Sequence, residues 1–315
     1  MTGTVWGAWA RRVTMAPGAV YALIVLSIVF ALFTAQFLTL HNLTNIGMQG
    51  SVLVIVSLGM TLIILTEGID LSLGSVLGLA GVILALAVKQ QVALPLAILA
   101  AIGVGGIFGT LNGVLISRIG LPPFVVTLGS FGMAQGLALV LTEGSSVPGL
   151  GPAVQYFNDG RILGIPVPII MTAIAFLVVY IILYHTKFGT YVFALGGNQE
   201  ALALAGVRAR LYKTGVYVLG GSLAGVGALV MTARMNAAHP TVGVGLEFDA
   251  IASVLLGGTS FERGRGWLGG AIIGALAISV LRNGLNLIGL STSWQVSLVG
   301  MVIILAIVMD ALRGV

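Results

Sequence analysis

Residues 49 to 66 read Gln49-Gly-Ser-Val-Leu-Val-Ile-Val-Ser-Leu-Gly-Met-Thr-Leu-Ile-Ile-Leu-Thr66 and contain no charged side chain. About 20 helical residues are enough to cross the hydrocarbon core of a bilayer. The apolar residues do not alternate with period two, which argues against a strand. Because only helices and closed barrels satisfy every backbone group in lipid, the stretch predicts a membrane-spanning helix.

The composition extends this prediction to the whole chain. Charged residues make up 7% of the 315 and hydrophobic residues 58%, whereas roughly 25% of a soluble domain is charged. The chain also holds 46 glycines, and small residues let helices approach closely in a bilayer. We therefore expect an all-α polytopic membrane protein with a single transmembrane domain over residues 1–315.

Several kinds of site are disfavoured by the same composition. The chain has no cysteine, and its three histidines are scattered along the sequence, so no metal site is predicted. The formal net charge is +5, but the basic residues lie between apolar runs, where they set orientation rather than bind nucleic acid. Carboxylates are few and lie in different segments, so the chain is not expected to be an enzyme.

The apolar runs define about ten candidate spans. They are Ala19 to Leu38, Gln49 to Thr66, Leu73 to Val88, Val92 to Ser117, Pro122 to Thr142, Pro166 to Tyr184, Thr214 to Ala233, Ala250 to Phe261, Trp267 to Ile288 and Trp294 to Asp310. The first is read as an uncleaved helix rather than a signal peptide, because no small-residue cleavage site follows it. The segment from Ala250 to Phe261 is too short to cross alone and predicts a half-helix, which Asp249 could cap.

The distribution of basic residues predicts the orientation. With the amino terminus in the cytoplasm, ten of the 14 lysines and arginines fall on the cytoplasmic side, which is the positive-inside pattern. Both termini are then cytoplasmic. Five spans in each half would give an inverted repeat, and a weak likeness between residues 109–121 and 274–285 agrees with it.

A polar, basic loop from Thr186 to Lys213 interrupts the apolar sequence, and residues 200–206 within it read E-A-L-A-L-A-G. Asn198 is a good N-cap, Glu200 suits the first turn of a helix, and Gly206 is a typical C-terminal stop. These signals predict a short helix from about Gln199 to Ala205. It could dock a soluble partner or could simply be a capped surface helix between two spans.

A second polar segment, Glu67-Gly-Ile-Asp-Leu-Ser-Leu-Gly-Ser75, lies between two spans. Asp70 or Ser72 could cap the helix that begins near Leu73. Alternatively, the segment is a helix break beside the transport path, because carboxylates next to a membrane core are costly unless solvated or paired.

Uncharged polar residues within the spans could bind a hydroxylated solute or join neighbouring helices. The candidates for the translocation path or its gating are Gln49, Asp70, Ser72, Asn112, Asn283 and Asn286. Rows of buried ionisable residues, the usual proton relay, are absent from the sequence, and no phosphate-binding G-x-x-x-x-G-K-[ST] motif occurs. The energy for transport is therefore expected to come from another chain.

Several segments together resemble the permease subunits of ribose-type monosaccharide ATP-binding cassette (ABC) importers, which include ribose, xylose and galactoside permeases. The matching segments are Asn42 to Ile46, Gly59 to Thr66 running into Gly68 to Ser75, Pro123 to Gly129, Ala194 to Asn198, Asp249 to Ser260 and Asn283 to Gly289. In the docking loop, the match rests on Gly197, Asn198, Glu200, Ala201 and Gly206. Leu202 stands where the general loop pattern has a second alanine, and Glu67 where relatives more often have a small residue.

The resemblance implies a set of partners and a fold. It implies a second permease copy, identical or paralogous, two ATP-binding cassette subunits, and a periplasmic or lipid-anchored sugar-binding protein. It also implies that the permease lies in the bacterial inner membrane. The resemblance further implies that this chain binds no cofactor and that the ATPase subunits hold ATP and Mg²⁺. The implied fold has about ten helices per subunit, similar to vitamin B12-type importers.

Other functions remain open at this point. The same machinery could import a nucleoside, a branched-chain amino acid or a sugar-like signal. An ion-coupled secondary transporter or a non-transporting scaffold would be a different class of protein.

Overall fold

A computed structural model describes residues 18–261, 264–291, 293–301 and 304. The protein is mainly helical, with four strands of two residues each in the described part. The elements are α2 (Gly18–Phe33), α3 (Leu40–Ile64), α4 (Leu73–Lys89), α5 (Leu94–Val114), the π-helical turn η1 (Leu115–Ile119), α6 (Pro123–Thr142), β1 (Val147–Pro148), α7 (Pro152–Asp159), β2 (Arg161–Ile162), β3 (Ile165–Pro166), α8 (Val167–His185), α9 (Lys187–Gly197), α10 (Gln199–Leu204), α11 (Ala209–Met235), β4 (Ala237–Ala238), α12 (Leu246–Leu256) and α13 (Leu268–Leu287).

Within the described residues, six helices are long and apolar enough to cross a membrane: α3, α5 with η1, α6, α8, α11 and α13. The helices α2 and α4 are apolar but shorter. The expected span from Trp294 to Asp310 extends beyond the described residues, although residues 293–301 are helical. A membrane-spanning, all-α fold is confirmed, while the total of about ten spans, the inverted repeat and the likeness to vitamin B12-type importers stay predictions.

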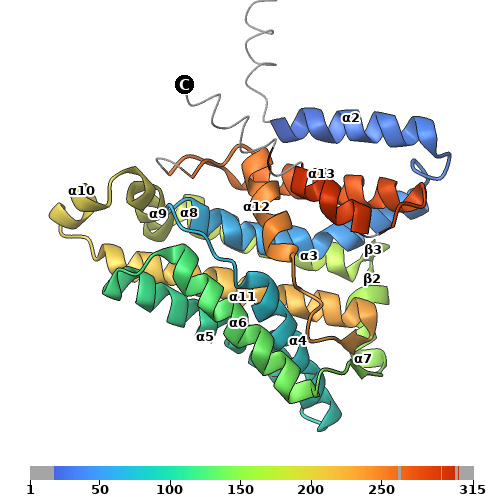
Figure 1. Cartoon of the computed structure of the whole chain (residues 1–315), viewed down its shortest axis with the longest axis horizontal. Helices are drawn as coiled ribbons and strands as arrows, with labels where there is room; N and C mark the ends of the chain where they lie inside the picture. Colours follow the sequence, from blue (N-terminus) through green and yellow to red (C-terminus); the bar gives the residue numbers. More distant parts are fainter. Residues whose placement is uncertain (1–17, 262–263, 292, 302–303, 305–315) are drawn as a thin grey trace, which may run out of the picture.

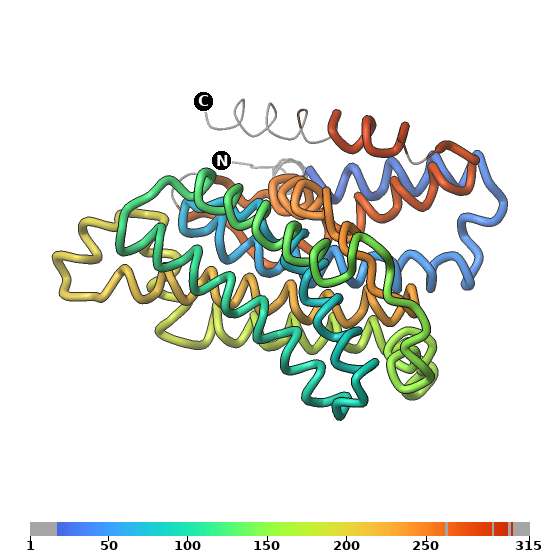
Figure 2. The backbone as a smooth tube through the Cα atoms, turned by 60° about the horizontal axis from the view of Figure 1, so that its bottom comes forward, coloured from blue at the N-terminus to red at the C-terminus, as the bar shows by residue number. Residues whose placement is uncertain are grey.

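The long helices lie side by side, and two small regions mark opposite ends of the molecule. Helices α9 and α10 lie at one end, and α7 with the β2–β3 hairpin lies at the other, in both Figure 1 and Figure 2. Helix α3 is the most central span: it contacts α8, α11, α12 and α13, and 83% of its most apolar window is buried. Helices α2 and α13 pack together along one edge (Figure 1).

Helices α5 and α11 approach each other closely enough for their backbones to touch. A Cβ atom added to Gly105 would lie 1.9 Å from the carbonyl oxygen of Gly221, and one added to Gly109 would lie 2.2 Å from the carbonyl oxygen of Tyr217. Gly113, four residues further along α5, meets Thr214 in the same way, with 2.7 Å to its Cα. Residues four apart share one face of a helix, so α5 presents a stripe of glycines to α11. We call this contact the glycine seam.

Several elements were not expected from the sequence. Helix α3 begins at Leu40, nine residues before the expected span, after Thr39 accepts a hydrogen bond from the Asn42 backbone N–H at 3.3 Å. The loop before α8 folds into α7 and a hairpin, and β1 pairs with β4 after α11. The first part of the polar loop is the helix α9 rather than an open chain.

Candidate functional site

A polar cavity of about 290 Å³ lies between helices α3, α11, α12 and α13. Small-ligand pockets usually measure about 300–1,000 Å³. The cavity is lined by Gln49, Val52, Leu53, Met231, Arg234, Leu246, Asp249, Ser279, Arg282, Asn286 and Gln295. Seven of these 11 side chains are polar, and three of the seven, Arg234, Asp249 and Arg282, are charged, in a chain with only 7% charged residues.

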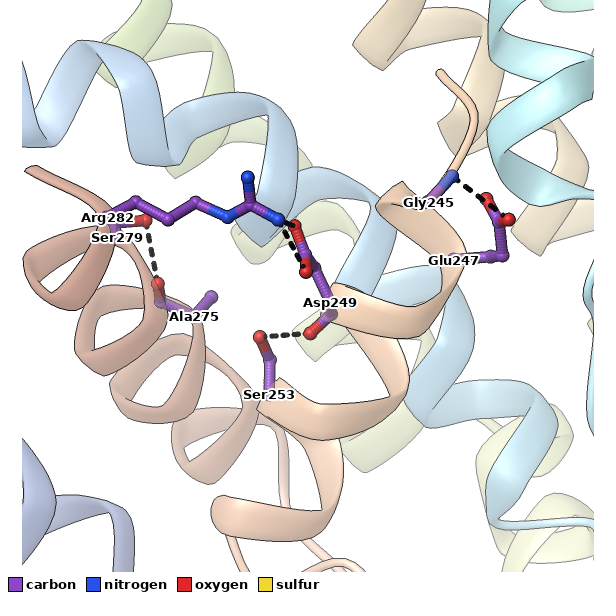
Figure 3. Close-up of polar contacts among 7 residues, drawn as sticks. All are labelled: Gly245, Glu247, Asp249, Ser253, Ala275, Ser279 and Arg282. Atoms are coloured by element: carbon purple, nitrogen blue, oxygen red, sulfur yellow. Dashed lines mark hydrogen bonds and ion pairs between the residues drawn. The ribbon is translucent and has the colours of Figure 1, made fainter. Parts of the chain in front are cut away.

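An ion pair forms one wall of this cavity. Arg282 of α13 reaches across to Asp249 of α12, and its Nη2 atom lies 2.9 Å from Oδ1 and 2.6 Å from Oδ2 (Figure 3). The Asp249 side chain is 7% exposed and that of Arg282 34%. The interpretation of Asp249 as the cap of the half-helix is wrong: Gly245 occupies the N-cap position, and the Asp249 carboxylate is occupied by Arg282. The half-helix itself is present as α12, with 11 residues.

Other cavity side chains are free to bind. Gln49, Arg234 and Asn286 make no side-chain hydrogen bond within the described part of the chain. The Nε atom of Arg282 is buried and likewise has no partner there. The structure therefore brings two of the predicted path residues, Gln49 and Asn286, to one cavity, together with two arginines that the sequence analysis did not select.

Glu247, which lies between the cavity residues Leu246 and Asp249 in the sequence, is almost completely buried at 1% exposure. Its Oε1 atom accepts a hydrogen bond of 3.1 Å from the backbone N–H of Gly245, and Figure 3 shows it pointing away from Asp249. Its Oε2 atom lies against Gly74, where an added Cβ would come within 2.0 Å. Glu247 therefore joins the start of α12 to the first turn of α4, where the positive end of the helix dipole favours a carboxylate.

Three other predicted residues, Asp70, Ser72 and Asn112, form a separate buried network. Oδ1 of Asp70 accepts hydrogen bonds from the backbone N–H of Ser72 at 2.8 Å and from its hydroxyl. The Nδ2 atom of Asn112 donates to Oδ2 of Asp70 at 3.2 Å and to the Ser72 hydroxyl at 3.0 Å. The hydroxyl of Ser130 on α6 donates to Oδ1 of Asn112. The network thus joins the break between α3 and α4 to α5 and α6.

This geometry excludes the capping interpretation of the Asp70 segment, while a role beside the transport path stays a prediction. Helix α4 begins at Leu73 as expected, but Ser72 at the N-cap position makes no side-chain capping bond. Asp70 instead binds the N–H of Ser72, one residue before the helix. The segment is a helix break whose polar groups are paired in the interior, and neither residue is a conventional cap.

Asn283 lies outside the cavity and is paired elsewhere. Its Nδ2 donates to Oδ1 of Asn42 at 2.9 Å, and Nδ2 of Asn42 donates to Oδ1 of Asn283 at 3.0 Å. Both side chains are buried. Their arrangement joins α3 to α13, so Asn283 acts as a helix contact rather than a wall of the described cavity.

At the opposite end of the fold from α7, the predicted short helix is present as α10. The Asn198 side chain accepts a hydrogen bond of 2.8 Å from the Ala201 backbone N–H, Glu200 lies in the first turn, and Gly206 adopts a φ of 77°. Leu202 is buried against Leu195 and Ala209, so α10 is anchored on one face.

The other face of α10 projects outward. Glu200 and Ala201 are exposed, and an added Cβ at Gly197 would meet nothing within 4 Å. Leu204 is 91% exposed, a large apolar side chain that the sequence analysis did not single out. The sequence contained a signal for this exposure. Leu202 is the fourth residue of α10 and Leu204 the sixth, and residues two apart lie on different faces of a helix.

A shallow pocket of about 490 Å³ adjoins α10. Three arginines from two segments meet in its wall: Arg118 of η1, and Arg208 and Arg210 from the start of α11. Gln199, Ala203, Val207, Ala209 and Leu211 complete it. This end of the molecule is therefore basic and partly apolar.

The apolar helices, with a polar cavity between them, define a multi-pass membrane permease. Residues 42–307 match the protein family described as "branched-chain amino acid transport system / permease component", and the chain belongs to this family. It is 41% identical over 293 residues to the ribose import permease protein of Escherichia coli (strain K12), covering 92% of this chain and 91% of the relative. It is 38% identical over 295 residues to the ribose import permease protein of Bacillus subtilis (strain 168), covering 93% and 92%.

A third relative has a different sugar in its name. The chain is 36% identical over 293 residues to the D-allose transport system permease protein of Escherichia coli (strain K12), covering 91% of this chain and 90% of the relative. No solved structure matched the chain.

Proposed function

We propose that this permease carries a monosaccharide such as ribose across the bacterial cytoplasmic membrane, as the membrane-spanning subunit of an ABC importer. Two relatives are described as ribose import permeases and a third as a D-allose permease. The observation that carries the proposal is the cavity between α3, α11, α12 and α13, because unbonded amide and guanidinium groups match the donors and acceptors of sugar hydroxyls.

The α10 end supplies the second part of the proposal, which is docking of a separate ATPase. Helix α10 is anchored through Leu202 and presents Glu200, Ala201 and Leu204 outward. An exposed apolar side chain beside polar ones is typical of a docking contact. Two ATPase subunits would hold ATP and Mg²⁺, and nucleotide binding on them would move α10 and bias the permease between two conformations.

The same end would face the cytoplasm. Arg118, Arg208 and Arg210 gather in one pocket there, in line with the positive-inside rule. Both termini would be cytoplasmic, and the opposite end, with α7 and the β2–β3 hairpin, would receive sugar from a binding protein. A second permease copy, identical or paralogous, would complete the pathway.

Uptake by reconstituted protein tests the function. The permease is placed in proteoliposomes with its ATPase and its binding protein, and uptake of radiolabelled D-ribose is followed with and without internal ATP. ATP-dependent uptake supports the proposal. Uptake that follows an imposed ion gradient without ATP would instead assign a secondary transporter.

The family description makes branched-chain amino acids a competing class of substrate. The same vesicles are therefore tested with leucine. Uptake of leucine but not ribose, allose or galactose would overturn the assignment of a monosaccharide while leaving the importer mechanism intact.

A further inference from the structure

We infer that the cavity beside the Asp249–Arg282 ion pair is a saccharide-binding site of the permease itself, so that the membrane subunit as well as the binding protein discriminates among sugars. The inference rests on the proposed function and adds a location and a chemistry to it. A path without specific contacts would pass every sugar that the binding protein delivers at the same rate.

The ion pair offers a sugar hydroxyl both a hydrogen-bond acceptor and a hydrogen-bond donor. A carboxylate accepts hydrogen bonds and a guanidinium donates up to five, so together they match a pair of adjacent hydroxyls, each of which can donate and accept. Arg282 uses Nη2 for both oxygens of Asp249, and its buried Nε has no partner in the described part of the protein. The Arg282 side chain as a whole is 34% exposed and lines the cavity, and Nη2 alone engages Asp249. Guanidinium N–H groups therefore remain that a ligand hydroxyl could accept from.

The rest of the wall supplies what a sugar ring requires. Gln49 from α3, Asn286 from α13 and Arg234 from the last turn of α11 face the same cavity with unbonded side chains. These three groups come from three of the four helices around the cavity, and Asp249 adds the fourth, α12, so a bound sugar would touch every helix that surrounds it. Apolar surface for the C–H faces of the ring comes from Val52, Leu53, Met231 and Leu246.

A purely structural role for the pair is the competing explanation. Asp249 and Arg282 do join α12 to α13, and removing one partner would leave the other charge unpaired. However, well-packed apolar residues could join two helices as well as an ion pair does. A structural role also gives no reason for unbonded Gln49, Arg234 and Asn286 to gather at the same place.

The test compares sugars at the permease step alone. The complete importer is reconstituted, and the binding protein is supplied at a saturating concentration. Its full loading with sugar is measured separately for each sugar. Maximal uptake rates are then compared for D-ribose and its 2-deoxy and 3-deoxy analogues. We expect at least one analogue to be about threefold to tenfold slower, the effect of one lost hydrogen bond.

Variants locate the discrimination. The double variant Asp249→Asn with Arg282→Gln removes both charges but keeps a hydrogen-bonding pair, and it should bring the ratio of rates close to one. Arg265→Gln, a matched change of an exposed arginine outside the cavity, should leave the ratio unchanged. Gln49→Leu and Asn286→Leu provide a second measurement that leaves the ion pair intact. Both side chains are exposed and unbonded, so folding should tolerate these changes.

The outcomes separate the inference from the function. Equal maximal rates for all sugars in the wild type, or an unchanged ratio in Gln49→Leu and Asn286→Leu, would refute a binding site in this cavity while ribose import stands. Absence of ATP-dependent uptake of any sugar would instead refute the proposed function. Lowered discrimination in the cavity variants, with Arg265→Gln unaffected, supports the site.

Discussion

Asn42 and Asn283 bind each other through two reciprocal hydrogen bonds of 3.0 and 2.9 Å, although 241 residues separate them in the sequence. Interhelical hydrogen bonds in membranes average about 0.6 kcal/mol and reach about 1.7 kcal/mol. We expect Asn283→Ala to lower the free energy of unfolding by about 1–2 kcal/mol. Denaturation in mixed micelles measures it, with Asn45→Ala as the control, because Asn45 is half-buried on the same helix as Asn42 and makes no side-chain hydrogen bond among described residues. Additive effects of Asn42→Ala and Asn283→Ala would contradict a direct pairing.

The glycine seam predicts opposite effects for the same substitution at two positions of α5. Alanine is favoured over glycine in a helix by about 0.8–1 kcal/mol. At Gly103, where an added Cβ meets nothing within 4 Å, Gly103→Ala should therefore be neutral or stabilising. At Gly105, the same methyl group would lie 1.9 Å from a backbone oxygen of α11, so Gly105→Ala should destabilise by at least about 1–3 kcal/mol. Thermal unfolding midpoints of the two variants test this prediction. Equal midpoints would refute a close backbone contact between α5 and α11 at Gly105.

Leu204 tests the docking surface. Leu204→Asp places a charge on the exposed face of α10 and should weaken association with the ATPase at least tenfold, because exposed apolar anchors carry much of a contact's free energy. The fold should be unaffected, since this side chain is 91% exposed. Leu163→Asp is the matched control, because Leu163 is 98% exposed in the hairpin at the other end of the molecule. Co-purification with the ATPase measures the effect, and equal loss in both variants would argue against α10 as the contact.

Gly206 tests whether the end of α10 must keep its backbone conformation. Its φ of 77° lies in the left-handed region, which asparagine tolerates better than other residues with a side chain. Gly206→Arg should therefore abolish coupled transport or assembly while membrane insertion persists, and Gly206→Asn should retain most of it. Assembly is scored by ATPase co-purification, and transport by ribose uptake. Normal uptake by Gly206→Arg would exclude a need for this conformation in docking.

An exchange of two side chains tests the Asp70 network. Asp70→Asn turns an acceptor at Oδ2 into a donor that faces the donor of Asn112, and it should cost about 1–3 kcal/mol of stability and reduce uptake. Adding Asn112→Asp restores a donor opposite an acceptor and also accepts the Ser130 hydroxyl. We therefore expect the double exchange to recover much of the stability and uptake. Failure to recover either would indicate that Asp70 acts through its charge.

Features set by neighbouring residues could be predicted from the sequence. The runs of apolar residues located α4, α6, α8 and α13 to within one or two residues at either end. The caps at Asn198 and Gly206 predicted α10 correctly because both act within one helical turn. Helix α9 was missed, since it lacks an N-cap side-chain bond and is stabilised by burial of Val192 and Leu195 against other elements.

Features set by distant residues could not be predicted in the same way. Asp249 has the position of a helix cap, but an arginine 33 residues away binds its carboxylate. Asn283 was grouped with the path residues because nothing local reveals Asn42 as its partner. A signal for Arg282 was available, since an arginine inside an apolar span is by itself grounds to expect a functional role.

The glycine seam also provides a fixed internal reference for measuring motion. Helices α5 and α11 touch through backbone atoms, so no rotamer change can let one slide past the other. Spectroscopic labels placed on their outer faces should keep a constant separation throughout a transport cycle, and the native chain has no cysteine to compete for thiol-reactive labels. Distances from that pair to labels on α10 and α12 would then report how far each of these elements travels.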